Sequence, residues 1–190
     1  MRNIVIICYL LINSTLFSQA EIKSYKWEEV IHSLPDTIYS ITFEKLKIKE
    51  LPIDLKRFKN IKVLNLSKNN LSELPSFIQE FEKLEVIYLD KNKFTEFPSV
   101  LLNNKNLKEL YLSRNEITVL PDEIDQLSEL VKLDLWSTAI TYFPPSIINL
   151  KKVQFIDLRG VTYGPTFIKE ITTSMNWVTF KYETPCSCVE

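Results

Sequence analysis

A 23-residue pattern repeats without insertion along most of this chain. Its copies begin at residues 38, 61, 84, 107, 130 and 153. In the first five copies, seven fixed positions hold apolar residues at 34 of 35 places, the exception being Asn104. Only 45% of the chain is hydrophobic, so chance does not produce such columns. A period of this length indicates a solenoid, in which each repeat buries its apolar face against its neighbours.

Each copy starts with a short stretch of alternating residues, such as residues 62–66. The alternation predicts a β-strand that turns Leu64 and Leu66 inward and leaves Val63 and Asn65 outward. Two further columns have structural explanations. An Asn can satisfy backbone groups where the chain leaves the strand, and it recurs as Asn69, Asn92 and Asn115, with Thr138 as a partial substitute. A Pro suits the first turn of a helix on the opposite side, and it recurs as Pro52, Pro75, Pro98, Pro121 and Pro144.

The copies resemble the 23-residue subtype of the leucine-rich repeat family, LxxLxLxxNxLxxLPxxIxxLxx, over residues 38–175. The resemblance implies an α/β solenoid with a curved parallel β-sheet on its concave side and short helices or turns on its convex side. The resemblance supports protein recognition in general terms only, because one fold hosts many functions. Cytosolic scaffolds of Ras-type signalling are similar in repeat subtype.

The segments outside the repeats have separate predictions. Residues 1–20 resemble a signal peptide, with an early positive charge, a short apolar run and small residues before a cleavage site. We therefore expect an exported protein without an integral membrane segment; if the segment is not cleaved, the alternative is a cytoplasmic protein. Residues 21–37 are predicted to form a helical N-terminal cap, with Ser24 as a possible helix cap. Residues 165–176 are predicted to form a helix, and residues 176–190 a capping strand followed by a tail.

Composition limits the possible partners. The formal net charge is −1, and removal of residues 1–20 takes away Arg2 and makes it −2. Such a balance offers no basic excess for nucleic-acid binding. Only Gly160 and Gly164 are present, so no phosphate-binding loop is expected. The lone His32 is expected to be a surface or packing residue, because a metal or catalytic role would need partners that the sequence does not offer. We expect no cofactor and no metal, and a monomer.

The predicted tail carries two cysteines, Cys186 and Cys188. A local disulfide between them is possible, although a ring closed over one residue is strained. Free thiols, an intermolecular disulfide and a metal site remain alternatives. If the tail links chains, the protein is a structural or surface-assembly component of the cell envelope, and its gel migration should change with reductant.

The outward residues of the strands are the positions that the core leaves free, and we expect protein or peptide binding there. Outward aromatic residues are typical of binding hot spots, although aromatic pairs also stabilise sheets. The candidate residues are Val63, Val86, Tyr88, Asp90, Tyr111, Lys132, Asp134, Trp136, Phe155, Asp157 and Arg159. A sugar-cleaving enzyme using Asp134 and Asp157 is a weaker alternative, because carboxylates on an open surface lack the burial that shifts their pKa values.

Overall fold

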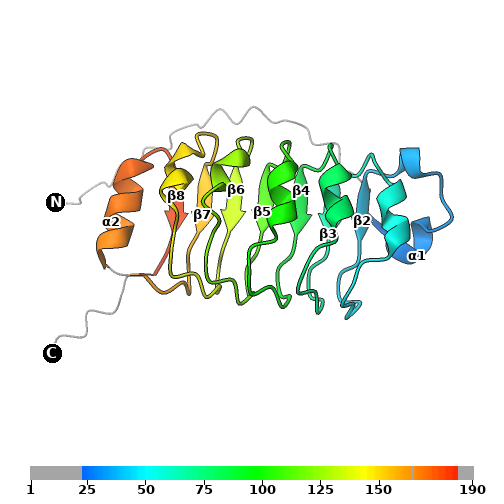
Figure 1. Ribbon diagram of the computed structural model, residues 1–190, viewed down its shortest axis with the longest axis horizontal. Coiled ribbons are helices and arrows are strands. Elements are labelled where there is room, and N and C mark those ends of the chain that lie inside the picture. Colours follow the sequence, from blue (N-terminus) through cyan, green and yellow to red (C-terminus); the bar gives the residue numbers. More distant parts are fainter. Residues whose placement is uncertain (1–22, 164, 184–190) are drawn as a thin grey trace, which may run out of the picture.

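The computed structural model describes residues 23–163 and 165–183, and it contains one parallel β-sheet whose strands follow each other in chain order (Figure 1). This arrangement confirms the predicted solenoid. The strands are β1 (Tyr25–Lys26), β2 (Ser40–Thr42), β3 (Val63–Asn65), β4 (Val86–Tyr88), β5 (Glu109–Tyr111), β6 (Lys132–Asp134), β7 (Phe155–Asp157) and β8 (Thr179–Lys181).

The repeat period sets the register of the sheet. Val63 pairs with Val86, and Val86 pairs with Glu109, so equivalent residues of consecutive copies lie side by side. The last pair is shifted, because Phe155 lies opposite Thr179, 24 residues later instead of 23. The sequence contains the same delay, because the apolar residues of the last strand, Trp177, Phe180 and Tyr182, each come one position later than the repeat period requires.

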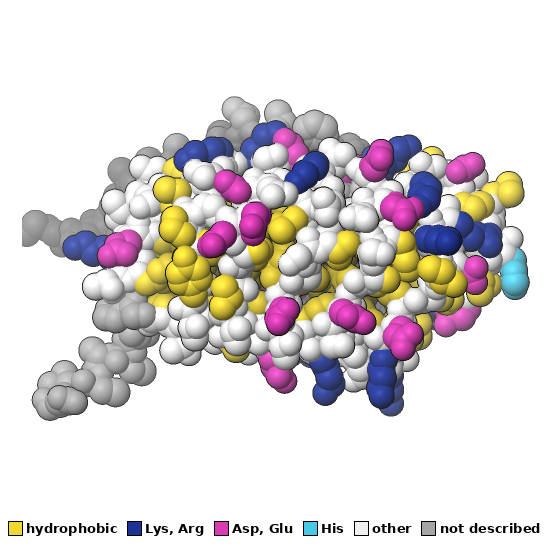
Figure 2. All heavy atoms as spheres, viewed as in Figure 1, with side chains coloured by type: hydrophobic (Ala, Val, Ile, Leu, Met, Phe, Trp, Pro, Cys, Tyr) yellow, Lys and Arg dark blue, Asp and Glu magenta, His cyan; other side chains and the backbone are white. Residues whose placement is uncertain are grey.

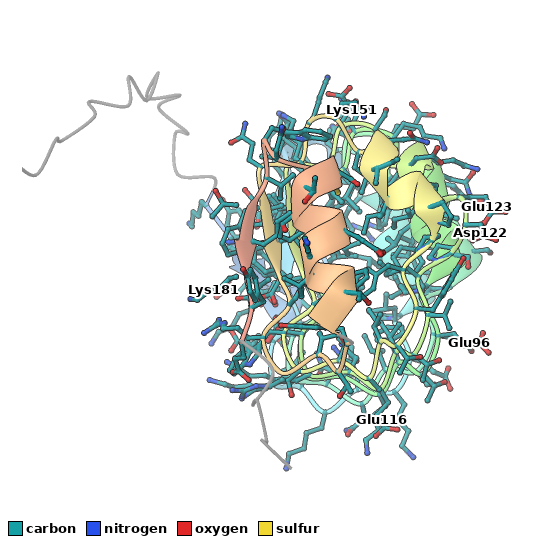
Figure 3. The ribbon with its side chains drawn as sticks, turned by 90° about the vertical axis from the view of Figure 1, so that its left-hand side faces the viewer. Glu96, Glu116, Asp122, Glu123, Lys151 and Lys181 are labelled. Atoms are coloured by element: carbon teal, nitrogen blue, oxygen red, sulfur yellow. The ribbon has the colours of Figure 1, made fainter. Side chains whose placement is uncertain are left out.

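The other side of each repeat is a short 3-10 helix, and Figure 3 shows these helices on the side away from the sheet. Four Pro residues of the column immediately precede a helix or lie at its cap, whereas after Pro121 the helix begins only at Ile124. The 3-10 helices are η1 (Pro35–Thr37), η2 (Ile53–Arg57), η3 (Ser76–Glu80), η4 (Ser99–Asn103), η5 (Ile124–Gln126) and η6 (Pro145–Asn149). They are the short helices or turns that the resemblance implies for the convex side.

The core lies between these two layers and is continuous from end to end. Of the 35 column positions, all are buried except Ile48, Leu74 and Phe143, which are partly buried and pack against the core. Asn104 is also buried, and its amide donates to the carbonyl oxygens of Ile78 and Phe81. An amide therefore replaces an apolar group there because two backbone carbonyls accept its hydrogen bonds.

The Asn column forms a buried hydrogen-bond ladder, as predicted. The Asn92 amide donates to the carbonyl oxygens of Leu66 and Leu89, and its Oδ1 accepts the N–H of Leu71. Asn69 and Asn115 make equivalent bonds, and the Thr138 hydroxyl donates to Leu135. Each Asn thus ties the turn after one strand to the preceding repeat.

The N-terminal cap is shorter than predicted. β1 extends the sheet through Lys26, so Ser24 does not cap a helix, and α1 (Trp27–Val30) has only one turn. Leu34 has an extended backbone because the residue before a proline, here Pro35, avoids helical backbone, and its side chain is 76% exposed. Trp27 and Val30 nevertheless cover the end of the core, with the Trp27 ring stacked 5.2 Å from that of Phe43.

The C-terminal end is covered by α2 (Pro165–Ser174), which lies beside the last strands in Figure 1. Its apolar side contacts the core, since Ile168 and Ile171 are buried and Phe167 stacks on Phe143, and Met175, directly after the helix, is buried as well. No helix in the described part of the chain is both long and apolar enough to cross a membrane. The predicted signal peptide, Cys186 and Cys188 lie outside the described residues.

Candidate functional site

The sheet presents one outward face, and the register places all eleven candidate residues on it or directly after its strands. We call this set the concave strip. Pairing places Tyr88 beside Tyr111, Tyr111 beside Asp134, and Asp134 beside Asp157. Val63 and Val86 are neighbours in the adjoining column, as are Lys132 and Phe155. The third column, which follows the strands, contains Asp90, Trp136 and Arg159.

Two stacked tyrosines form the centre of the concave strip. The ring centroids of Tyr88 and Tyr111 are 4.5 Å apart with an interplanar angle of 19°. The Tyr111 hydroxyl donates to Glu109 Oε2 at 2.6 Å. Burial, together with Glu109, raises the pKa of Tyr111, and burial also raises that of Tyr88. Both phenols therefore stay neutral and offer half-buried rings with polar ends, a combination suited to protein interfaces.

Glu109 was not among the predicted site residues. It lies two residues before Tyr111 on the same strand, and residues two apart share a face of a sheet. The signal was therefore in the sequence. What could not be read there is that the Glu109 carboxylate reaches along the strand to the Tyr111 hydroxyl.

Basic side chains lie against the aromatic rings of the concave strip. The Lys132 ammonium is 4.7 Å from the Tyr111 centroid and 5.6 Å from that of Phe155. The guanidinium carbons of Arg114 and Arg159 are 4.1 and 5.2 Å from the Trp136 ring centroid. Cations at these distances are attracted to the ring and limit the orientations that it can adopt. Arg114 was not predicted to belong to the site.

The two aspartates of the strip differ in environment. Asp157 is only 5% exposed, and Arg159 holds both of its oxygens, with Nη2 2.7 Å from Oδ2. Asp134 accepts the Trp136 N–H at 3.0 Å, and burial raises its pKa, helped by the negative charges of Asp157 and Asp90. The prediction that these carboxylates lack burial was wrong. Arg159 covers Asp157 by binding both of its oxygens, and Asp134 lies between Tyr111 and Asp157 of the neighbouring strands.

Asp90 and the valines complete the strip. The Ser67 hydroxyl donates to Asp90 Oδ1 at 2.5 Å, so this carboxylate is fixed beside the sheet. Val63 and Val86 are partly exposed and extend the apolar area towards the N-terminal end. Within the described ranges, no three His, Cys, Asp or Glu side chains converge in a way that could hold a metal ion.

Comparison with solved structures identifies similar folds. A leucine-rich repeat protein of Leptospira interrogans shares 30% sequence identity over 78% of this chain and 38% of its own, with a TM-score of 0.69. An ectodomain of a plant membrane receptor kinase from Arabidopsis thaliana, in complex with CASPARIAN STRIP INTEGRITY FACTOR 2, has 24% identity, coverage of 77% and 18%, and a TM-score of 0.62. An internalin of Listeria monocytogenes has 16% identity, coverage of 78% and 48%, and a TM-score of 0.62.

This chain therefore spans less than half the length of each of these three structures. No curated protein sequence matches it. Models of the leucine-rich repeat match residues 60–81, 82–140 and 105–160, which together exceed half of the chain. With the repeat columns, the parallel sheet and the Asn ladder, these matches show that the chain belongs to the leucine-rich repeat family.

Proposed function

We propose that this chain is a non-enzymatic module that binds a protein or peptide through the concave strip. The observation that carries the proposal is the Tyr88–Tyr111 stack on the outward face, next to Trp136 and its two arginines. The core does not need these rings, because it is closed by the inward residues of the same strands. A plant relative in fold was solved in complex with another factor, which supports a role in recognition.

The geometry favours binding without much rearrangement. Strand pairing fixes the backbone of the strip, and the side-chain contacts described above limit the rotamers of Tyr111, Trp136 and Arg159. A preformed surface loses little conformational entropy on binding, so more of the contact energy contributes to affinity. Half-buried Tyr, Trp and Arg side chains are also the residues most enriched at binding hot spots.

The test is capture of partners by the wild-type chain and by a Tyr111→Ala/Trp136→Ala variant. A matched control, Tyr142→Ala/Trp177→Ala, removes the same residue types from outside the strip, where these side chains are 48% and 40% exposed. The proposal requires a protein that the wild type and the control retain and the strip variant loses. Equal retention by all three chains would place the binding surface elsewhere and refute the proposal.

We also propose that the protein is exported, on the basis of residues 1–20. Their positive start, apolar run and small residues before position 21 match the requirements of a secretory signal. Fractionation of the source cell and N-terminal sequencing of the isolated protein test this proposal. A mature chain that starts at Glu21 outside the cytoplasm is expected, and an intact chain in the cytoplasm would contradict it.

A further inference from the structure

A row of basic residues follows the concave strip along one edge of the sheet. After each third-column residue the backbone turns left-handed, with φ between 55° and 68°, and the residues at this position are Lys45, Lys68, Lys91, Arg114, Ser137 and Gly160. The N–H of Lys68 donates to the Asp90 carbonyl, and that of Lys91 donates to the Ser113 carbonyl. The turn thus continues the backbone ladder from one repeat to the next.

The backbone explains the conformation but not the choice of residue. A left-handed residue with a Cβ is less stable than glycine in the same place. Only the last position has the glycine, Gly160, whose φ is 68°. The first four positions instead hold cations, which we call the basic row: Lys45, Lys68, Lys91 and Arg114. The left-handed turn by itself therefore does not require a charge at these positions.

The charges of the basic row are only partly neutralised. Lys68 pairs with Glu44 at 2.6 Å, and Lys45 approaches the same carboxylate oxygen at 3.5 Å. The ammonium of Lys68 accordingly lowers the pKa of Glu44. Arg114 lies over Trp136, and Lys91 is exposed and forms no ion pair with the described residues. Adjacent strands are about 4.8 Å apart, so the four cations extend over about 14 Å.

A second row limits the shape of an anionic partner. Five residues further along the first three of these repeats, the exposed residues are acidic: Glu50, Glu73 and Glu96. Figure 3 places Glu96 on the side away from the sheet, and Figure 2 shows acidic side chains across the lower half of this convex face, with basic side chains below them. A broad anionic surface such as a membrane would meet both rows. A narrow chain lying beside the concave strip would meet the basic row alone.

We propose that the basic row binds an acidic segment of the protein that the concave strip recognises. This inference rests on the proposed function and specifies the chemistry of the partner. A polypeptide is favoured over other polyanions because Arg114 belongs to the row and also contacts Trp136 of the strip. A ligand that covers the aromatic residues is thereby brought beside the cations, and the partner combines an apolar contact with neighbouring Asp or Glu residues.

The experiment measures binding of poly-L-glutamate to the full chain as the salt concentration increases. The test variant is Lys68→Gly/Lys91→Gly, which removes two charges and suits the left-handed backbone, so the fold should be retained. The control is Lys83→Gln/Lys105→Gln, which removes two exposed lysines that lie between the 3-10 helices and the next strands. We expect the test variant to lose roughly fivefold or more in affinity at low salt, and the control to resemble the wild type.

Equal loss in both variants would show attraction to overall charge and would overturn the proposal, as would absence of binding by the wild type. Tighter binding of heparin, or of vesicles of equal parts phosphatidylglycerol and phosphatidylcholine, would assign the row to a different kind of anion and also overturn it. The Tyr111→Ala/Trp136→Ala variant is measured alongside. The capture of protein partners by this variant does not involve poly-L-glutamate. A basic row that does not bind the acidic polymer can therefore be distinguished from a concave strip that does not bind a partner.

Discussion

Replacing Asn92 by Leu should destabilise the fold by about 3 kcal/mol, whereas the same change at Asn104 should alter stability by less than about 1 kcal/mol. At Asn92 the change removes three hydrogen bonds of 2.9 to 3.1 Å and a longer one of 3.5 Å to the Asp90 carbonyl, and it leaves the buried N–H of Leu71 without its acceptor. The carbonyls of Leu66 and Leu89 keep other donors, since Asn69 also donates to Leu66 and Asn115 to Leu89. The orphaned N–H therefore causes much of the loss.

Asn104 has the same side chain in a different situation. Its amide donates to the carbonyls of Ile78 and Phe81, which also accept the N–H groups of Phe81 and Leu84. Its own Oδ1 is buried without a hydrogen-bond partner. The change to Leu removes two hydrogen bonds, each of which contributes about 1 kcal/mol to stability. It also removes a buried unsatisfied oxygen, which lowers stability by about 1–3 kcal/mol. It also restores the apolar column, so the terms nearly cancel.

Urea unfolding of the two variants and the wild type, followed by circular dichroism, measures the difference. The comparison requires that the unfolding free energy decrease with urea concentration at the same slope in all three proteins. A changed slope would indicate partial unfolding of the repeat array. A loss at Asn92→Leu no larger than that at Asn104→Leu would refute the argument that the unsatisfied N–H of Leu71 dominates.

Three further outcomes are expected. Gly160→Ala should cost about 1 kcal/mol of unfolding free energy in the same assay, because φ is 68° and the new Cβ would lie 3.3 Å from the Ser137 Cα. Trp27→Ala should cost about 2 kcal/mol by exposing the end of the core. Asp134→Asn should raise the melting temperature at pH 7. The folded-state pKa of Asp134 is raised by burial and by Asp157, so its charge opposes folding above that pKa. The gain should therefore disappear below the ordinary Asp pKa, and a gain that persists at pH 3 would contradict this cause.

The repeat made most of the fold predictable because it specifies the backbone position of every residue in a copy. Once the columns are aligned, Tyr88 must lie beside Tyr111, and the structure stacks their rings. The delayed pairing of Phe155 with Thr179 was predictable for the same reason, since the apolar residues of the last strand come one position late. These relations depend on backbone spacing alone.

The parts that were not predicted depend on how far side chains reach and on competing local preferences. The Arg159 guanidinium folds back onto Asp157, two residues earlier, and buries it, which column alignment does not show. Arg114 lies outside the strands, so its contact with Trp136 follows from a left-handed turn that the sequence did not reveal. At the N-terminus, Tyr25 and Lys26 pair with β2, so α1 begins only at Trp27 and has one turn.

The two proposed binding features meet at one end of the basic row, and this arrangement bears on the size of the partner. The Arg114 guanidinium carbon is 4.1 Å from the Trp136 ring centroid, so a ligand of any size that covers Trp136 also lies beside this cation. The other end of the row, Lys45, lies directly beyond β2, whereas Trp136 follows β6. A ligand that contacts the whole row and Trp136 must therefore cross four strand spacings, about 19 Å. A folded protein or an extended segment of several residues covers that distance, whereas a small ligand reaches only Arg114 and its neighbours.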